Sequence, residues 1–293
     1  MTQGLQIATA HSRTPRAPGP GGRAVLSLLP RGDSVVWGRS LSVKYVLDGE
    51  ERYRVGKTTH IVRPGRFLVL ETSVPIEAIL PRAAAGFCLS LPAGHGSGSP
   101  LCRGGIVFEA QNSALGRSLS DAASRLAARS SENDGLGDLF AETGAGLPAL
   151  LREAEMAMSQ LEVAKQATRQ DLLQRLEAAR ALMARTLHRP LSVAEMADAA
   201  GMSPFHFVRR FAEAYGEPPA AQHARLRLCE AADGLLGGLS VGEAARRAGF
   251  ASTGSFSRAF RARFGLSPSG LRDLPPQQIA QILRNSRQDG SPA

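Results

Sequence analysis

The stretch GFASTGSFSRAFR, residues 249–261, predicts a short turn followed by a helix. Its apolar face is marked by Phe256, Phe260 and Phe264, which recur every four positions as the buried side of a helix does. Directly upstream, residues 239–248 (LSVGEAARRA) predict a second short helix, with a serine placed to cap it and a glutamate three residues further on. Two short helices joined at a glycine turn predict a helix-turn-helix, which inserts its second helix into the major groove of DNA.

The chain contains a second copy of this pattern. Residues 191–201 (LSVAEMADAAG) repeat residues 239–249 (LSVGEAARRAG). After one inserted residue the repeat continues, with Ser203, Phe207, Arg209, Phe211, Gly216 and Pro219 matching Ser252, Phe256, Arg258, Phe260, Gly265 and Pro268. The duplication preserves an arginine as well as the apolar core, which makes it a specific signal and not a chance pair of helices.

Residues from about 170 to 272 resemble the tandem helix-turn-helix DNA-binding domain of the AraC/XylS family of bacterial transcription regulators. The resemblance rests on Ser203-Pro204, Phe207, Arg209, Phe211, Arg225-Leu226-Arg227, Gly249-Phe250, Phe256, Arg258, Phe260, Gly265, Ser267-Pro268 and Arg272. The sequence departs from the family pattern at three places. Phe207 stands where leucine is usual, Leu271 where an aromatic residue is common, and Gly254 where the recognition helix is more often polar.

Composition fits a soluble regulator with a nucleic-acid partner. The 293 residues are 43% hydrophobic with a formal net charge of +9, which indicates a globular chain long enough for two cores. The positive charge is nearly all arginine, which suits phosphate and guanine contacts but also follows from a high-GC coding bias. Three widely spaced cysteines predict reduced thiols, and the chain shows neither a secretion signal nor a long apolar run. We therefore expect a cytoplasmic, nucleoid-associated protein without a membrane partner.

The region from about residue 34 to residue 91 has β character. Alternating apolar residues flank Asp48-Gly49, which predicts a hairpin, and Pro64-Gly65 precedes a run suited to a buried strand. Several short strands at this spacing predict a small barrel or sandwich. The segment resembles, more weakly, the cupin-like effector domain that precedes the DNA-binding domain in many members of the family.

The predicted strands carry no metal-binding pattern. A metal cupin needs clustered histidines and a carboxylate, whereas His60 and His95 are isolated from one another. We expect no metal, no cofactor and no enzymatic activity. Arg63, Arg66 and Arg82 are candidates for an anion pocket, with three separately solvated arginines as the alternative.

Helices are predicted from about residue 105 onward. Leu147, Leu151, Ala154, Met158 and Leu161 form a seam of roughly two heptads, which is typical of an intramolecular packing face. The resemblance to the family implies that this seam is also the candidate surface for a homodimer. A helix over 168–187 follows and ends before Pro190. Another helix, from about 220 to 236, connects the two helix-turn-helix motifs and holds them in a fixed relation.

The predicted fold class is α+β with two domains: a β-rich, cupin-like N-terminal domain followed by helices, then an all-α domain with two helix-turn-helix motifs. The predicted segments are a disordered tail (1–23), the effector and dimerisation domain (24–165), the DNA-binding domain (168–274) and a C-terminal tail (275–293).

The resemblance implies DNA contacts at ten positions: Phe205, His206, Val208, Arg209, Arg210, Thr253, Gly254, Ser255, Arg258 and Arg261. Arginine reads guanine in a bidentate way, while hydroxyl groups are less selective. The alternative for Arg209 and Arg258 is a phosphate contact or an intramolecular ion pair. Arg210, Arg225, Arg261 and Arg263 are better suited to phosphate or solvent, and the effector-binding residues are unknown. The predicted function is a sequence-specific transcription regulator, an activator by family majority, with double-stranded DNA, RNA polymerase and a small-molecule effector as partners. The alternatives are a metal enzyme fused to a DNA-binding domain, a repair protein with a methyl-accepting cysteine, and a non-specific architectural DNA binder.

Overall fold

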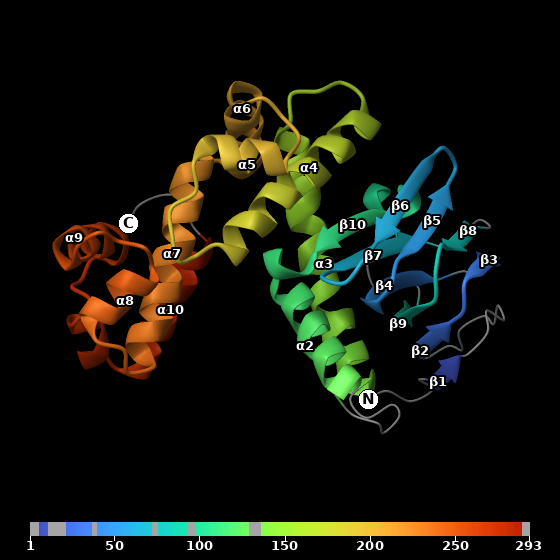
Figure 1. Cartoon of the computed structure of the whole chain (residues 1–293), viewed down its shortest axis with the longest axis horizontal. Coiled ribbons are helices and arrows are strands. Elements are labelled where there is room, and N and C mark those ends of the chain that lie inside the picture. Colours follow the sequence, from blue (N-terminus) through green and yellow to red (C-terminus); the bar gives the residue numbers. More distant parts are fainter. Residues whose placement is uncertain are drawn as a thin grey trace. The chain divides into compact units, whose positions relative to one another are not determined.

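The computed structural model describes residues 6–10, 22–36, 40–71, 76–92, 98–128 and 136–288. The chain divides into an N-terminal unit (residues 1–158 and 165–174) and a C-terminal unit (residues 159–164 and 175–293). The N-terminal unit is β-rich with helices after the strands, and the C-terminal unit is helical (Figure 1). The predicted α+β fold class is confirmed.

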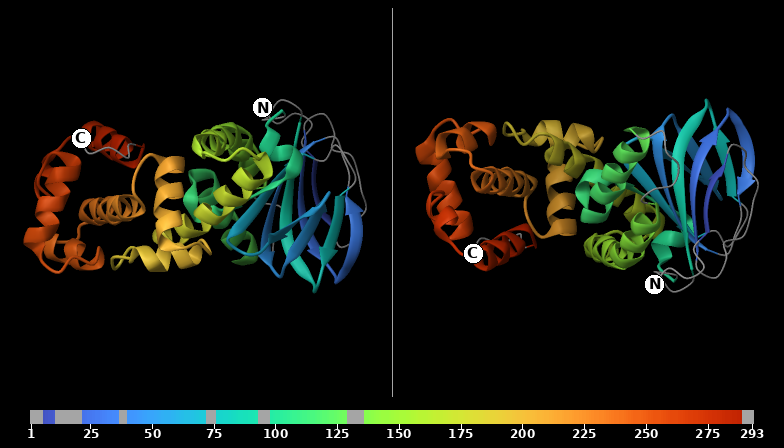
Figure 2. Two further views of the ribbon diagram at one scale, coloured as in Figure 1. Left: turned by 90° about the horizontal axis from the view of Figure 1, so that it is seen from above. Right: turned by 90° about the horizontal axis from the view of Figure 1, so that it is seen from below.

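The N-terminal unit is built on two β-sheets. Its described strands are β1 Gln6–Ala10, β2 Arg23–Leu29, β3 Gly32–Val36, β4 Leu41–Asp48, β5 Glu51–Val55, β6 Thr58–Val62, β7 Arg66–Glu71, β8 Ile76–Leu80, β9 Ala84–Leu91 and β10 Ile106–Glu109. They form one sheet in the order β1-β2-β9-β4-β7-β10 and another in the order β3-β8-β5-β6. Figure 2 shows the strands of this unit from two further sides. Apart from the parallel pair β1–β2, the pairings between described strands are antiparallel.

Central strands of the larger sheet are buried on both faces. Val46 of β4 joins a core cluster with side chains of both sheets, including Leu68 and Tyr53. One residue along, Tyr45 stacks on Phe87 with ring centroids 5.2 Å apart. Helices α1 (Pro100–Gly104) and α2 (Ala114–Ala128) contact β7 and β4 respectively. Double-sided burial explains the continuous apolar run Phe67-Leu68-Val69-Leu70 in β7, whose four side chains are all buried.

The interior between the strands also holds a buried ion pair. Lys44 on β4 is 6% exposed and Glu51 on β5 is fully buried. The Lys44 Nζ atom lies 3.2 Å from Glu51 Oε1 and donates to Ser27 Oγ at 2.8 Å, and the Tyr53 hydroxyl donates to Glu51. A buried charge is stable only with such partners, so this cluster fixes the mutual placement of β2, β4 and β5.

The predicted hairpin at Asp48-Gly49 is wrong. Strand β4 pairs with β7 and β9, whereas β5 pairs with β6 and β8, so the turn carries the chain from one sheet to the other. Gly49 has a φ of 88°, and a Cβ there would lie 2.6 Å from the carbonyl oxygen of Ala83. Alternation of apolar residues identifies the two strands but does not identify their partners. The hairpin forms one turn later, between β5 and β6.

Both predicted tails contain ordered elements. In the segment 1–23, strand β1 pairs in parallel with β2, from Gln6 opposite Arg23 to Ala10 opposite Ser27. The tail prediction is therefore wrong for β1, because backbone pairing orders a segment whose composition favours disorder. At the other end, helix α10 (Pro276–Gln288) places Leu283 in a hydrophobic core. His95 and most of residues 1–23 lie outside the described residues.

Two long helices follow the strands. They are α3 (Leu136–Gln160) and α4 (Gln166–Arg185), after the short 3-10 turn Ala110–Asn112 and α2. The predicted seam residues Leu147, Leu151, Ala154, Met158 and Leu161 are each no more than 7% exposed in the single chain. The seam is therefore an intramolecular packing face, and its side chains are not available to a second copy.

Candidate nucleic-acid interface

The C-terminal unit contains two helix-turn-helix motifs of the same local geometry (Figure 1). The first consists of α5 (Val193–Ala199) and α6 (Pro204–Tyr215), and the second of α8 (Val241–Arg247) and α9 (Thr253–Phe264). Each motif begins with a capping box. The hydroxyl oxygens of Ser192 and Ser240 accept the N–H of Glu195 and Glu243, both at 3.2 Å, and these carboxylates accept the serine N–H groups. The predicted cap at Ser240 is confirmed, and the repeat in sequence is a repeat in structure.

The turn between the two helices is also duplicated. Gly201 and Gly249 adopt left-handed conformations, with φ of 59° and 68°. In each turn the residue after the glycine donates its N–H to the carbonyl five residues back, at 2.9 Å. A side chain in this backbone region is disfavoured, which explains the glycine at both positions.

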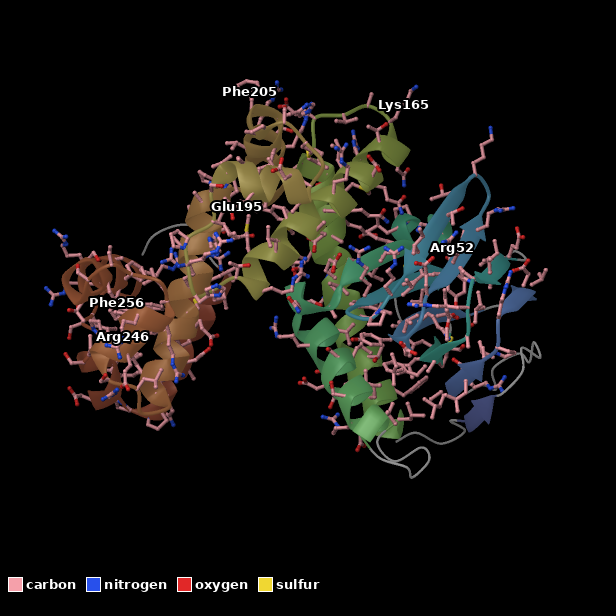
Figure 3. The ribbon with its side chains drawn as sticks, viewed as in Figure 1. Arg52, Lys165, Glu195, Phe205, Arg246 and Phe256 are labelled. Atoms are coloured by element: carbon pink, nitrogen blue, oxygen red, sulfur yellow. The ribbon has the colours of Figure 1, made fainter. Side chains whose placement is uncertain are left out.

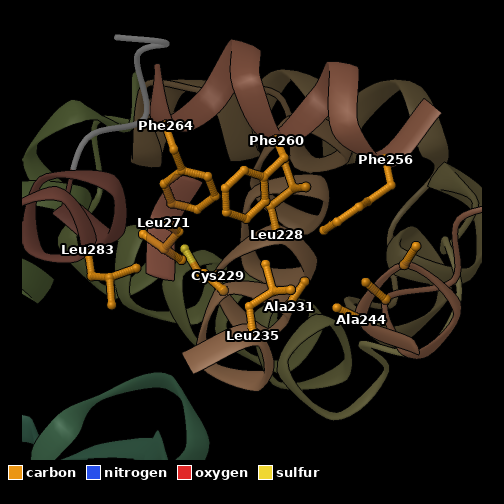
Figure 4. Close-up of a cluster of buried hydrophobic side chains, with 13 residues drawn as sticks. Leu228, Cys229, Ala231, Leu235, Ala244, Phe256, Phe260, Phe264, Leu271 and Leu283 are labelled. Carbon is orange, nitrogen blue, oxygen red and sulfur yellow. The ribbon is translucent and has the colours of Figure 1, made fainter. Parts of the chain in front are cut away.

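Aromatic anchors fix the orientation of both recognition helices, α6 and α9. Phe256, Phe260 and Phe264 of α9 lie in the hydrophobic core shown in Figure 4. Phe207 and Phe211 of α6 are fully buried in the same way. Burial of each such side chain contributes about 1.5–3 kcal/mol, so the opposite face of each helix is held toward solvent.

The ten predicted contact residues all lie on these two helices. Seven are exposed, namely Phe205, His206, Arg209, Thr253, Gly254, Arg258 and Arg261, while Val208, Arg210 and Ser255 are partly covered. Phe205 is the most prominent, because 83% of its surface is exposed at the second position of α6 (Figure 3). Most large apolar side chains are buried, so an aromatic ring held in water at the start of a recognition helix indicates a contact surface.

Helix α7 (Pro219–Leu236) is anchored to both motifs. His223, near its beginning, accepts the N–H of Leu191 at 3.3 Å and hydrogen-bonds through its other ring nitrogen to the carbonyl oxygen of Thr186 at 2.8 Å. Arg227, one turn further on, donates to two carbonyl oxygens in the turn of the second motif, at 2.7 and 3.0 Å. The helix therefore connects the motifs through specific hydrogen bonds as well as through the chain itself.

The arginines of the first recognition helix are engaged by a carboxylate. Arg209 donates to Glu213 Oε1 at 2.9 Å, and Arg210 donates to Glu213 Oε2 at 2.6 Å. Although partial burial opposes it, these hydrogen bonds lower the pKa of Glu213, so the carboxylate is charged at neutral pH. Arg209 also lies 3.4 Å from the carboxylate of Glu162. Sequence reasoning missed Glu213, although its spacing of three and four residues from the arginines is the signal for such pairs.

The arginines of the second recognition helix have different surroundings. Within the part of the chain that the structure describes, the guanidinium groups of Arg258 and Arg261 make no hydrogen bond and no ion pair, and both are exposed. They are free to meet an anionic partner. Arg209 and Arg258, equivalent in sequence, are therefore not equivalent in structure.

Two arginines predicted to face phosphate or solvent have partners within the chain. Arg225 forms a largely buried ion pair with Glu217 at 2.7 Å. Arg263 donates to the carbonyl oxygen of Ser286 in α10 at 2.5 Å. The prediction is wrong for Arg225, which is largely buried with a partner from the preceding loop, whereas Arg263 is half-buried and held by α10.

Among the described residues of the N-terminal unit, neither a shared anion pocket nor a metal site is formed by the side chains that the sequence singled out. Arg63 pairs with Glu50 and Arg66 with Glu109, each at 2.6 Å, so these arginines do not form a shared anion pocket. Within the described ranges, His, Cys, Asp and Glu side chains do not gather in groups of three as a metal site requires. None of the helices in the described part is both long and apolar enough to span a bilayer.

Comparisons with known proteins point to the same region of the chain. Residues 196–273 match the family model described as a helix-turn-helix domain. A search of curated proteins gives no match. Among solved structures, the DNA-binding domain of AdpA, a global transcriptional factor in complex with target DNA, is 31% identical. The match covers 36% of this chain and 97% of that one, with a TM-score of 0.33.

Two further structures are similar. An AraC-type transcriptional regulator from Chromobacterium violaceum is 28% identical over 37% of this chain and 91% of that one, with a TM-score of 0.32. ToxT from Vibrio cholerae O395 is 10% identical over 83% of this chain and 94% of that one, with a TM-score of 0.34. On its duplicated motif and the family match, the C-terminal unit carries a helix-turn-helix domain of the AraC type, the DNA-binding domain of transcription regulators.

Proposed function

We propose that the protein is a sequence-specific DNA-binding regulator that activates transcription in response to a small molecule bound by its N-terminal unit. One observation carries the DNA-binding part: two capped helix-turn-helix motifs each hold a recognition helix with its anchors buried and its other face exposed. Duplicated geometry of this kind suits two contacts with one duplex.

Base reading is assigned to one face of each recognition helix. In the first motif these residues are Phe205, His206, Val208 and Arg209, and in the second they are Thr253, Gly254, Ser255 and Arg258. Arg261 is assigned to phosphate, whereas Arg210 is held by its ion pair with Glu213. Ser255 is the weakest candidate, because its hydroxyl already donates to the carbonyl oxygen of Ser252 at 2.8 Å.

The two faces differ in chemistry, so their DNA segments should differ in sequence. The first presents an aromatic ring and an imidazole, whereas the second presents a hydroxyl, a glycine and an unpaired arginine. One chain should therefore recognise an asymmetric site in which the two segments lie about 10 base pairs, or ~34 Å, apart.

Selection of binding sites from random double-stranded DNA tests this proposal. The wild-type chain should enrich one asymmetric sequence with two separated blocks of preference. Binding without enrichment would instead favour the non-specific architectural function, which has no sequence preference to select.

The regulatory part of the proposal assigns RNA polymerase as the partner at the promoter. Transcription reconstituted with purified polymerase on a template carrying the selected site should increase when the protein is added. A decrease would show repression and contradict the activator assignment. The candidate dimer seam is buried within the chain, so no dimer surface is assigned to it.

A further inference from the structure

The two helix-turn-helix motifs differ strongly in charge. Helices α5 and α6 carry two arginines and three carboxylates, a formal charge of −1. Helices α8 and α9 carry five arginines and one carboxylate, a formal charge of +4. The charged residues are Arg209, Arg210, Glu195, Asp198 and Glu213 in the first motif, and Arg246, Arg247, Arg258, Arg261, Arg263 and Glu243 in the second. Because DNA is a dense line of negative charge, motifs that differ this much cannot contribute equally to electrostatic binding.

One position accounts for one of the two charges by which the recognition helices differ, since α6 carries a formal charge of +1 and α9 one of +3. The repeat places Phe211 and Gly216 of the first motif in register with Phe260 and Gly265 of the second. In that register Glu213 corresponds to Ala262. The first recognition helix therefore carries a partly buried carboxylate where the second carries an exposed methyl group.

Glu213 is placed to neutralise both arginines of its helix. Its Oε1 atom accepts from Arg209 at 2.9 Å and its Oε2 atom from Arg210 at 2.6 Å. Glu213 is only 16% exposed, whereas the Arg209 side chain is 56% exposed. A phosphate approaching Arg209 must therefore compete with a carboxylate that is already bound, and it also meets that carboxylate's negative charge.

We propose that Glu213 withholds Arg209 and Arg210 from phosphate, so that the two motifs contribute unequally to the electrostatic part of DNA binding. The second motif then supplies most of the electrostatic binding, and the first contributes through the fit of its exposed residues to its own DNA segment. This inference rests on the proposed DNA-binding function. Weaker phosphate contact by the first motif should make the protein more selective. Attraction to phosphate strengthens binding to every DNA sequence alike, whereas contacts with base edges strengthen binding only to the sequence that they match.

A reciprocal pair of variants tests the inference in the full-length chain. Glu213→Gln keeps the shape of the side chain and removes its charge, while Ala262→Glu builds into the second motif the carboxylate that the first motif has. Affinity for the selected duplex and for a random-sequence duplex of equal length would be measured between about 50 and 200 mM salt. Circular dichroism would verify that each variant is folded.

Glu213→Gln should bind the random duplex about 3- to 10-fold more tightly. The slope of log affinity against log salt concentration should become steeper by about one, which corresponds to the release of one more counterion. Its preference for the selected duplex over the random one should fall. Ala262→Glu should bind both duplexes more weakly, with a shallower salt dependence. If Glu213→Gln does not fold, the Ala262→Glu variant tests the inference by itself: unchanged affinity and salt dependence in this variant would contradict it.

Two outcomes would overturn the inference while the proposed function stands. Unchanged affinity and salt dependence in Glu213→Gln would show that the carboxylate does not withhold the arginines. Weaker binding of Glu213→Gln to the selected duplex would show that Glu213 positions Arg209 for base reading. Failure of the wild-type chain to bind either duplex would instead contradict the proposed function, and the inference with it.

Discussion

At the scale of single residues, equivalence in sequence does not guarantee equivalence in surroundings. Arg209 and Arg258 occupy the same place in the repeat, yet one is paired with Glu213 and the other has no partner among the described residues. The sequence predicts both arginines as DNA contacts, and the structure distinguishes them. The difference follows from the side chain four residues further along each helix, glutamate in one and alanine in the other.

Phe205 offers a direct test of apolar base contact. An exposed aromatic ring at the start of a recognition helix suits the C5-methyl group of thymine, which projects into the major groove. Replacing one thymine of the selected site by uracil removes only that methyl group and should weaken wild-type binding by about 0.8 kcal/mol, roughly fourfold. In Phe205→Ala the same replacement should have no effect. Equal losses in the wild type and the variant, measured by fluorescence anisotropy, would show that Phe205 does not contact the methyl group.

At the scale of elements, the two turn glycines share a conformation but not an environment. A Cβ added at Gly201 would come no closer than 3.5 Å to another described atom, the end of the Arg175 side chain. A Cβ at Gly249 would lie 2.5 Å from the carbonyl oxygen of His188, in the loop that precedes the first motif. The second turn is therefore packed against the backbone beside the first motif.

Alanine substitutions at the two glycines should reveal this difference. Gly201→Ala should cost about 1–2 kcal/mol, the strain of a side chain in the left-handed region. Gly249→Ala should cost about 1–3 kcal/mol more, because the backbone must also move to relieve the close contact. Urea denaturation of the two variants measures both values. Equal destabilisation would contradict the tight packing of the second turn.

Helix α7 contains a buried histidine that should make stability depend on pH. Burial lowers the pKa of His223 from its ordinary value of 6.5, with nearby Arg227 and Arg189 acting in the same direction against the hydrogen bond to Thr186. The folded chain therefore keeps His223 neutral at a pH where the unfolded chain binds a proton. Stability contributed by the neutral ring is present above about pH 6.5 and decreases as the pH falls below it.

The free energy of unfolding should accordingly fall between about pH 7 and pH 5 in the wild type. His223→Gln retains a donor and an acceptor but does not titrate, so its loss over the same range should be smaller. Denaturation of both proteins across this range isolates the contribution of residue 223 from that of other groups. A variant that loses as much stability as the wild type would show that His223 is not the responsible group.

At the scale of the whole molecule, the C-terminal part was more predictable than the N-terminal part. The repeated sequence predicts local geometry well, because the helix caps, the turn glycines and the aromatic anchors each depend on residues only a few positions apart. Strand partners in the N-terminal unit are set by residues far apart, which is why the Asp48-Gly49 turn joins two sheets and not two paired strands. The position of β1 depends on pairing with β2 and could not be read from its own composition.

The same distinction holds for the candidate interface. All ten predicted contact residues lie on the recognition helices, because burial of one helix face determines exposure of the other. Charge pairing was less predictable. Arg225 and Arg263 find partners through tertiary packing, with Glu217 and with α10 respectively, and such partners have no local signal in the sequence.

If one chain binds two different DNA segments with its two motifs, each motif should determine the sequence preference of its own segment. Site selection from random DNA with the wild type, Phe205→Ala and Arg258→Ala measures this. We expect the wild type to select two blocks about 10 base pairs apart, Phe205→Ala to relax preference in one block, and Arg258→Ala to relax it in the other. Loss of preference at the same base pairs in both variants, or a symmetric wild-type site, would show that the motifs do not bind separate segments.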